Sequence, residues 1–142
     1  MTPSIALDGT EPIGDDELLY RRIPAAQAWF DPNVSPKPVP EAFRPRRDDV
    51  TGLSLIRGEP YNTAEQAARG PSKAGYYVAV LRAGDLRTLG IEVVPRPVDG
   101  ISGHAEIANL TAATRDSEEG KTLMVLLARE LCLRVEGPFV AP

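Results

Sequence analysis

The chain contains one histidine, His104, and Glu106 follows it two residues later in the segment GHAEI. An imidazole exchanges a proton near neutral pH, so His104 is a candidate general base or metal ligand. Alternate residues of a strand share a face, so the Glu106 carboxylate can pair with that imidazole. A histidine at a strand end that bonds backbone or solvent is the structural alternative, and it stays open.

The segment YRRI supplies the second candidate group, Arg21 and Arg22. A planar guanidinium binds phosphate or carboxylate through two parallel hydrogen bonds, which makes a strand-borne arginine a candidate anion ligand. Adjacent strand residues point to opposite faces, so only one of the two can enter a given site. Structural pairing with the acidic residues at 15–17 is the alternative.

The segment 31–49 holds five of the fourteen prolines and the third candidate group. Each proline fixes φ and removes a donor, so this segment is expected to be a loop on the surface. Arginine and aromatic residues are enriched at the centres of protein interfaces, which suggests a protein contact here. The interface candidates are Phe43, Arg44, Arg46 and Arg47. A solvated loop is the alternative, and the two aspartates that follow weaken a nucleic-acid role.

Motifs that would identify an enzyme are missing from the sequence. It has no phosphate-binding P-loop, no dinucleotide glycine fingerprint, no HExxH and no GxSxG. The single cysteine, Cys132, excludes an internal disulfide and any multi-cysteine zinc site, and its leucine neighbours suggest a buried thiol. We therefore expect no cofactor and no metal, and the sequence leans against an enzyme.

Composition limits the remaining classes. The 142 residues suit one domain, and 42% hydrophobic and 25% charged residues are ordinary for a globular protein. A net charge of −4 makes nucleic acid an unexpected partner, because phosphate capture needs a positive field. The chain has no apolar run of membrane-spanning length and no signal-peptide pattern at its start, so a cytoplasmic location is expected. The oligomeric state stays open.

The pattern of apolar residues predicts an α+β domain. Strands are expected near 17–23, 50–57, 76–81, 91–94 and 104–110, forming a small mixed or antiparallel sheet of about five strands with short helices. An apolar stripe from Leu123 to Val135 at helical spacing predicts one long C-terminal helix. Residues 1–15 are expected to be a flexible lead, and residues 16–142 a single domain.

Several of these segments together resemble a family of small bacterial proteins that has no assigned activity. The resemblance covers roughly residues 17–112 and includes YRRI, the LS pair at 53–54, VAVLRAGDLRTLGIEVV at 78–94 and HAEI at 104–107. Members have a Ser-Ser-x-x-Phe stretch where this chain has VPEAF at 39–43. The resemblance implies no catalytic residue.

A second resemblance concerns three residue types in chain order. An early strand arginine (Arg21 or Arg22), then Phe43 and the strand-borne Ser54, is similar to ADP-ribosyltransferase-like folds. Those folds also need a late acid, for which Glu106 is the candidate.

These observations lead to two functional expectations. The first is a non-catalytic accessory or adaptor protein that works through protein contacts in a bacterial multi-component system, with a defence or toxin–immunity setting compatible with it. The alternative is a small enzyme or nucleotide-binding domain centred on His104, Glu106 and Arg21 or Arg22. The enzyme alternative requires these side chains to converge in one pocket.

Overall fold

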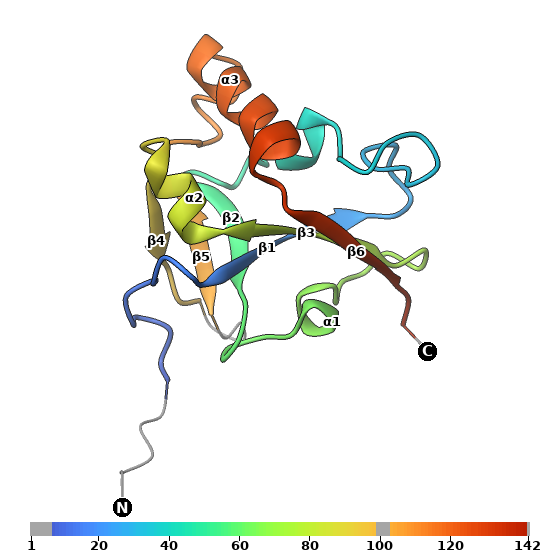
Figure 1. Ribbon diagram of the computed structural model, residues 1–142, viewed down its shortest axis with the longest axis horizontal. Coiled ribbons are helices and arrows are strands. Elements are labelled where there is room, and N and C mark those ends of the chain that lie inside the picture. Colours follow the sequence, from blue (N-terminus) through green and yellow to red (C-terminus); the bar gives the residue numbers. More distant parts are fainter. Residues whose placement is uncertain (1–6, 99–102, 142) are drawn as a thin grey trace, which may run out of the picture.

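The computed structural model describes residues 7–98 and 103–141 as one antiparallel sheet with helices on both faces (Figure 1). The six strands lie in the order β4-β5-β2-β1-β3-β6. In chain order they are β1 (Leu18–Pro24), β2 (Leu53–Arg57), β3 (Tyr76–Arg82), β4 (Val93–Pro95), β5 (His104–Ile107) and β6 (Arg134–Phe139). The sheet therefore has one strand more than the sequence predicts, and every pairing is antiparallel.

Alternation along β1 distributes its residues over the two faces of the sheet. Leu19 and Ile23 enter the main core, which α3 (Glu118–Leu126), its continuation η2 (Leu127–Leu131) and the short turn η1 (Pro40–Phe43) cover. Tyr20 lies on the opposite face in a smaller cluster against the short helix α1 (Ala64–Ala67). Arg21 points to the core side between two apolar neighbours, so its charge is carried into a buried position.

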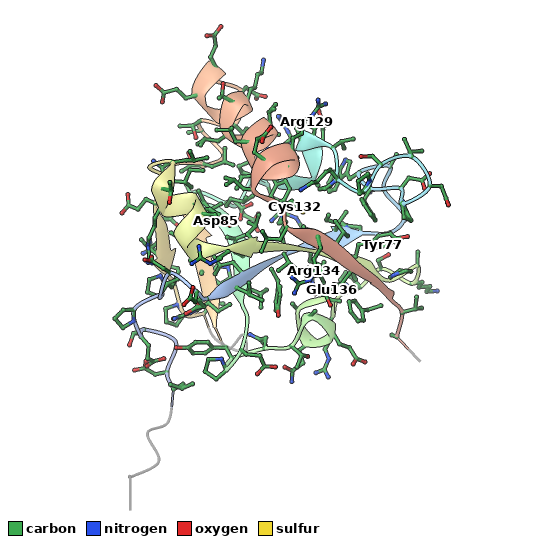
Figure 2. All side chains as sticks on the ribbon, in the orientation of Figure 1. Tyr77, Asp85, Arg129, Cys132, Arg134 and Glu136 are labelled. Carbon is green, nitrogen blue, oxygen red and sulfur yellow. The ribbon has the colours of Figure 1, made fainter. Side chains whose placement is uncertain are left out.

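The C-terminal region departs from the expected long helix. The helix spans 14 residues, α3 followed by the π-helical turn η2, and ends before Cys132. Arg134–Phe139 then forms β6 against β3, so the expectation of a helix through Val135 is wrong. A strand with Pro138 fits only at a sheet edge, and β6 occupies that edge. Figure 2 shows Cys132 where the helix gives way to the strand that carries Arg134 and Glu136.

The ends of two helices agree with local signals in the sequence. Ser117 caps α3, its hydroxyl accepting from the backbone N–H of Gly120 at 3.0 Å, and acidic residues follow in the first turn. Helix α2 (Ala83–Thr88) ends with Leu89 as its C-cap, and Gly90 follows with a φ of 74°, a conformation that glycine adopts without steric cost.

The segment before β1 packs against the domain from residue 9 onward. The backbone carbonyls of Gly9, Glu11 and Pro12 accept hydrogen bonds from the Arg57 guanidinium, and Ile13 belongs to the main core. The first six residues of the expected flexible lead lie outside the described residues.

Candidate functional site

The two central strands β1 and β2 pair over a short distance and then separate. Their register contains Leu19 with Arg57 and Tyr20 with Ile56, after which β1 continues along β3 and β2 continues along β5. The backbone carbonyl of Ser54 consequently faces β1 without a strand partner there. It accepts a hydrogen bond from Arg21 Nη1 at 3.0 Å. The separation is the structural origin of the site described below.

Arg21 occupies this split with all of its hydrogen bonds directed to backbone carbonyls. Besides Ser54, Nε donates to Ala42 at 2.9 Å and Nη2 donates to Arg44 at 3.2 Å. The residue is 8% exposed and forms no ion pair within the described part of the chain. Burial lowers the pKa of the guanidinium to about 10; Asp49 opposes the shift, and the positive charges of Arg46 and Arg22 add to it.

Arg22 lies on the opposite face of β1, as strand alternation requires. Its Nη1 donates to the backbone carbonyl of Arg69, and its guanidinium sits 4.6 Å from the ring centroid of Tyr76. Structural pairing of these arginines with the acidic residues at 15–17 does not occur. Those acids pair instead with Arg57, Arg82 and Arg87.

His104 and Ser54 form a hydrogen-bonded pair across β5 and β2. Ser54 Oγ and His104 Nε2 are 2.6 Å apart, and His104 Nδ1 lies 2.8 Å from the backbone carbonyl of Arg96. A carbonyl can only accept, so Nδ1 carries a hydrogen and, in the neutral ring, Nε2 accepts from the Ser54 hydroxyl. The hydrogen bond to His104 therefore orients the Ser54 hydroxyl, with its proton directed at Nε2.

Gly103 positions His104 at the start of β5. Its φ is 75°, and a Cβ at this position would lie 2.6 Å from Cβ of Tyr61. A side chain would therefore be strained and would collide with a neighbour. Glycine lets the chain enter β5 closely enough for its carbonyl to accept from the backbone N–H of Arg57 at 2.6 Å.

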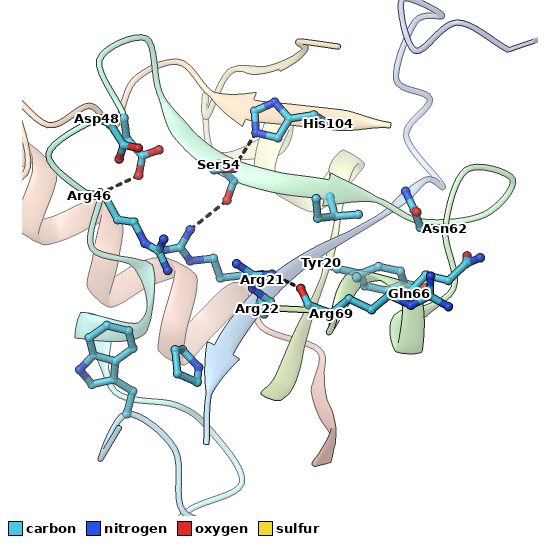
Figure 3. Close-up of a pocket in the computed structure, with 15 residues that line it drawn as sticks. Tyr20, Arg21, Arg22, Arg46, Asp48, Ser54, Asn62, Gln66, Arg69 and His104 are labelled. Carbon is cyan, nitrogen blue, oxygen red and sulfur yellow. Dashed lines mark hydrogen bonds between the residues drawn. The ribbon is translucent and has the colours of Figure 1, made fainter. Parts of the chain in front are cut away.

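Arg21, Arg22, Ser54 and His104 all line one cavity of about 400 Å³ (Figure 3). Its wall also includes Arg46 from the proline-rich loop and Arg69 after α1. The remaining lining residues are Tyr20, Pro24, Trp29, Asp48, Asp49, Ile56, Asn62, Gln66 and Ala67. The sequence candidates for an enzyme thus converge in part, because His104 and both arginines line this cavity. The expectation that only one of Arg21 and Arg22 can enter a given site is therefore wrong.

Positive charge predominates in this cavity. Four arginines line it against two aspartates. Asp49 is engaged by its own loop, where its carboxylate accepts from the backbone N–H of Arg46 at 2.7 Å. The guanidinium groups of Arg46 and Arg69 make no hydrogen bond or ion pair to residues 7–98 or 103–141. Arginines with free donors around a buried guanidinium form a site suited to an anion.

Glu106 lies beside the cavity but does not line it. It lies opposite Ser54 in the β2–β5 register, but its Oε1 accepts from Thr51 Oγ1 at 2.7 Å and from Arg96 Nε at 3.1 Å. It does not pair with His104, whose ring nitrogens bond Ser54 and a backbone carbonyl. The expected imidazole–carboxylate pair is therefore replaced by an imidazole–hydroxyl pair.

The loop residues expected at an interface have different positions. Phe43 is completely buried in the main core, which leaves it no surface for a partner. Arg44 pairs with Asp116 at 2.9 Å, and its carbonyl accepts from Arg21. Arg46 lines the cavity, while the neighbouring Arg47 is exposed and does not.

Sequence reasoning missed Trp29, Asp48, Asp49 and Arg69 as parts of the site. These residues come from three loops, and their meeting depends on the separation of β1 and β2. The sequence points to Ser54 only through two resemblances, as part of the LS pair at 53–54 and as the strand-borne serine of ADP-ribosyltransferase-like folds. Its adjacency to His104 needs the β2–β5 register, which a single sequence does not contain.

Metal and thiol chemistry have little basis in the described residues. They contain no cluster of three histidine, cysteine or acidic side chains arranged to hold an ion. Cys132 is buried, and burial raises the pKa of its thiol, which disfavours the reactive thiolate. Within the same residues no helix has the length and apolar character needed to cross a bilayer.

Comparison with known proteins gives no further assignment. No protein-family model matches the chain, and neither a curated protein nor a solved structure is significantly similar to it.

Proposed function

We propose that this protein binds a phosphate-bearing small molecule, such as a nucleotide, in the cavity between β1 and β2. The observation that supports the proposal is the surplus of arginine around it. Arg21 is buried without a carboxylate partner, and Arg22, Arg46 and Arg69 line the same space. A bound phosphate would offset the repulsion among these guanidinium groups and accept hydrogen bonds from Arg46 and Arg69, whose donors are not engaged by any residue that the structure describes.

The walls of the cavity also suit the rest of a nucleotide. Tyr20, Trp29 and Ile56 present ring and aliphatic surface beside the arginines. Aromatic rings stack on bases, and the amide nitrogen of Gln66, whose oxygen accepts from the backbone N–H of Thr63, can donate a hydrogen bond. An apolar wall with a few polar groups is typical of small-molecule pockets.

Calorimetric titration with ADP and with inorganic pyrophosphate tests the proposal. We expect the wild type to bind, and Arg46→Ala to bind at least about tenfold more weakly, since a charge-assisted hydrogen bond contributes about 1.5–3 kcal/mol. Arg47→Ala is the matched control, because it removes the same charge one residue away from the cavity. Absence of binding to both probes at millimolar concentration, or equal losses in the two variants, would overturn the proposal.

ADP-ribosyl transfer is a second candidate, favoured by one observation. Arg21 donates to the carbonyl of Ser54, and Ser54 lies opposite Glu106, so an arginine, a serine and an acid occupy three adjacent strands. This candidate predicts binding of NAD⁺ and slow release of nicotinamide, with the release abolished in Glu106→Gln. Binding of ADP without any nicotinamide release from NAD⁺ would leave phosphate binding alone.

The accessory role expected from the sequence stays a prediction. Phe43 is buried and Arg44 is engaged by Asp116, so Arg47 and the cavity-lining Arg46 are what remains of the expected contact surface. A protein partner in a bacterial multi-component system is consistent with these positions but gains no support from them.

A further inference from the structure

The hydrogen bonds around Ser54 form an ordered relay. The Arg96 carbonyl accepts from His104 Nδ1 at 2.8 Å, and His104 Nε2 accepts from Ser54 Oγ at 2.6 Å. His104 is 7% exposed, so its ring is held by burial as well as by these two bonds. A hydroxyl, a base that accepts its proton and a third group that orients the base are the parts of an activated nucleophile.

The surroundings of Ser54 indicate that the electrophile of this relay is a phosphoryl group. Ser54 and His104 both line the arginine-rich cavity, and Arg21 Nη1 donates to the carbonyl of Ser54 itself. Figure 3 shows Ser54 between the His104 ring and the Arg21 guanidinium. Guanidinium groups beside a nucleophile stabilise the charge that develops on phosphoryl oxygens during transfer.

We propose that Ser54 is a nucleophile toward the phosphorus of a phosphate ester bound in this cavity, with His104 as its general base. The inference rests on the proposed function, because the arginines must first hold the phosphoryl group. It goes beyond binding by assigning a covalent step to a residue pair that no motif in the sequence identifies.

The reaction balances without a cofactor. The Ser54 proton passes to His104 Nε2 as Oγ bonds to phosphorus, the ester P–O bond breaks, and the imidazolium returns its proton to the departing oxygen. Water then gives a proton to His104 and attacks phosphorus, the Oγ–P bond breaks, and Ser54 recovers its proton. The products are the free alcohol and phosphate. Throughout, Arg96 keeps the Nδ1 hydrogen in place through its carbonyl.

A fluorophosphonate tests the first half of this sequence, because it forms the same Oγ–P bond with loss of fluoride. Intact-mass spectrometry and peptide mapping would be applied to the full chain. We expect one adduct, located on Ser54 and absent in Ser54→Ala. We also expect His104→Gln to slow labelling by about 100-fold, in the range of general-base catalysis. Ser117→Ala, which removes a hydroxyl at a helix cap, should label at the wild-type rate.

Pyrophosphate titration of the same samples separates this inference from the proposed function. Binding of pyrophosphate without labelling of Ser54 would overturn the nucleophile and leave the phosphate site standing. Absence of binding of both pyrophosphate and ADP would overturn the phosphate site on which the inference rests. Labelling of Ser54 that is unchanged in His104→Gln would overturn the role of the base. Circular dichroism of each variant excludes unfolding as the cause of a lost adduct.

Discussion

Two buried arginines lie at opposite ends of β2, and their surroundings differ. Arg57 is the last residue of the strand, and Arg21 of β1 donates to Ser54 near its start. Arg57 is 1% exposed and meets Glu17 through two hydrogen bonds of 2.7 and 2.8 Å, with Tyr61 stacked 4.3 Å from its guanidinium carbon. Burial alone would lower its pKa, but the hydrogen bonds and charge of Glu17 outweigh that effect, and the pKa is raised. Arg21 is almost as buried and has carbonyls but no carboxylate, so its pKa is lowered.

The difference separates a completed charge site from an incomplete one. Glu17 supplies within the chain the anion that Arg57 requires, so the Arg57 cluster needs no ligand to be stable. Among the described residues, Arg21 has no carboxylate in hydrogen-bond contact. The nearby charge of Asp49 is opposed by the like charges of Arg46 and Arg22, and a cavity lies in front of Arg21. A buried cation without its anion is costly, and groups with strongly perturbed pKa values cluster at functional sites.

The largest expected effect comes from removing the carboxylate of Glu17, the anion that completes the Arg57 site. Glu17→Gln keeps the shape of the side chain but leaves Arg57 as a buried cation without a carboxylate, which should cost on the order of 3 kcal/mol of unfolding free energy. Urea denaturation measures it. Asp16→Asn is the control, because that exposed carboxylate pairs with Arg82 at the surface and its loss should cost less than about 1 kcal/mol. Equal costs would show that Arg57 is not a completed site.

Pyrophosphate should stabilise the incomplete site and leave the completed one unaffected. At a ligand concentration of about 100 times Kd, the unfolding free energy of the wild type should rise by about 2.7 kcal/mol. Glu17→Gln should gain the same increment, because three residues of β2, about 10 Å, separate Arg57 from Ser54. Arg46→Ala should gain much less. Thermal and urea unfolding with and without pyrophosphate measure the increments, and loss of the increment in Glu17→Gln would show that the two ends are coupled.

His104→Ala tests how much the hydrogen-bonded pair of Ser54 and His104 contributes to the unfolding free energy. The substitution removes two hydrogen bonds and leaves the Arg96 carbonyl and the Ser54 hydroxyl without partners, so we expect a loss of about 2 kcal/mol. Ser54→Ala should cost less, about 1 kcal/mol, because the imidazole can still bond to Arg96. Urea unfolding of both variants measures this order. If Ser54→Ala cost more than His104→Ala, the serine would be the main structural member of the pair.

The fold could be predicted from the sequence where local patterns decide it. Strands near 17–23 and 76–81 are predicted from their apolar residues, and Ser117 and Gly90 are local signals of helix ends; each corresponds to an observed feature. The last strand could not be predicted in this way. Val135 continues a helical stripe in the sequence, whereas the π-helical turn before Cys132 and the free edge of β3 redirect the chain into β6.

The candidate site shows a sharper limit. His104, Arg21 and Arg22 were identifiable because rare or charged side chains on predicted strands stand out. The separation of β1 and β2, which opens the cavity, is a property of pairing between segments more than thirty residues apart. The replacement of Glu106 by Ser54 as the partner of His104 depends on the same long-range register.

The smallest expected effect is on the unfolding free energy at alkaline pH, which Tyr61 beside Arg57 lowers and Arg21 raises as the pH increases. Burial and the hydrogen bond to Glu11 raise the pKa of Tyr61 from 10.0 to about 12. The folded state keeps this proton between pH 10 and 12 while the unfolded state has lost it. The stabilisation is therefore complete below about pH 10 and is lost as the pH rises through 12.

Arg21 contributes the opposite slope in the same range. Its pKa is lowered to about 10 from 12.5, so above pH 10 the unfolded state holds more protons and stability increases with pH. Tyr61→Phe removes the falling contribution and leaves that of Arg21. We expect urea unfolding at pH 9 and pH 11 to show a smaller loss of stability in Tyr61→Phe than in the wild type, with Glu11→Gln between them. If Tyr61→Phe lost as much unfolding free energy between pH 9 and pH 11 as the wild type, the Tyr61 proton would not be held by the completed site.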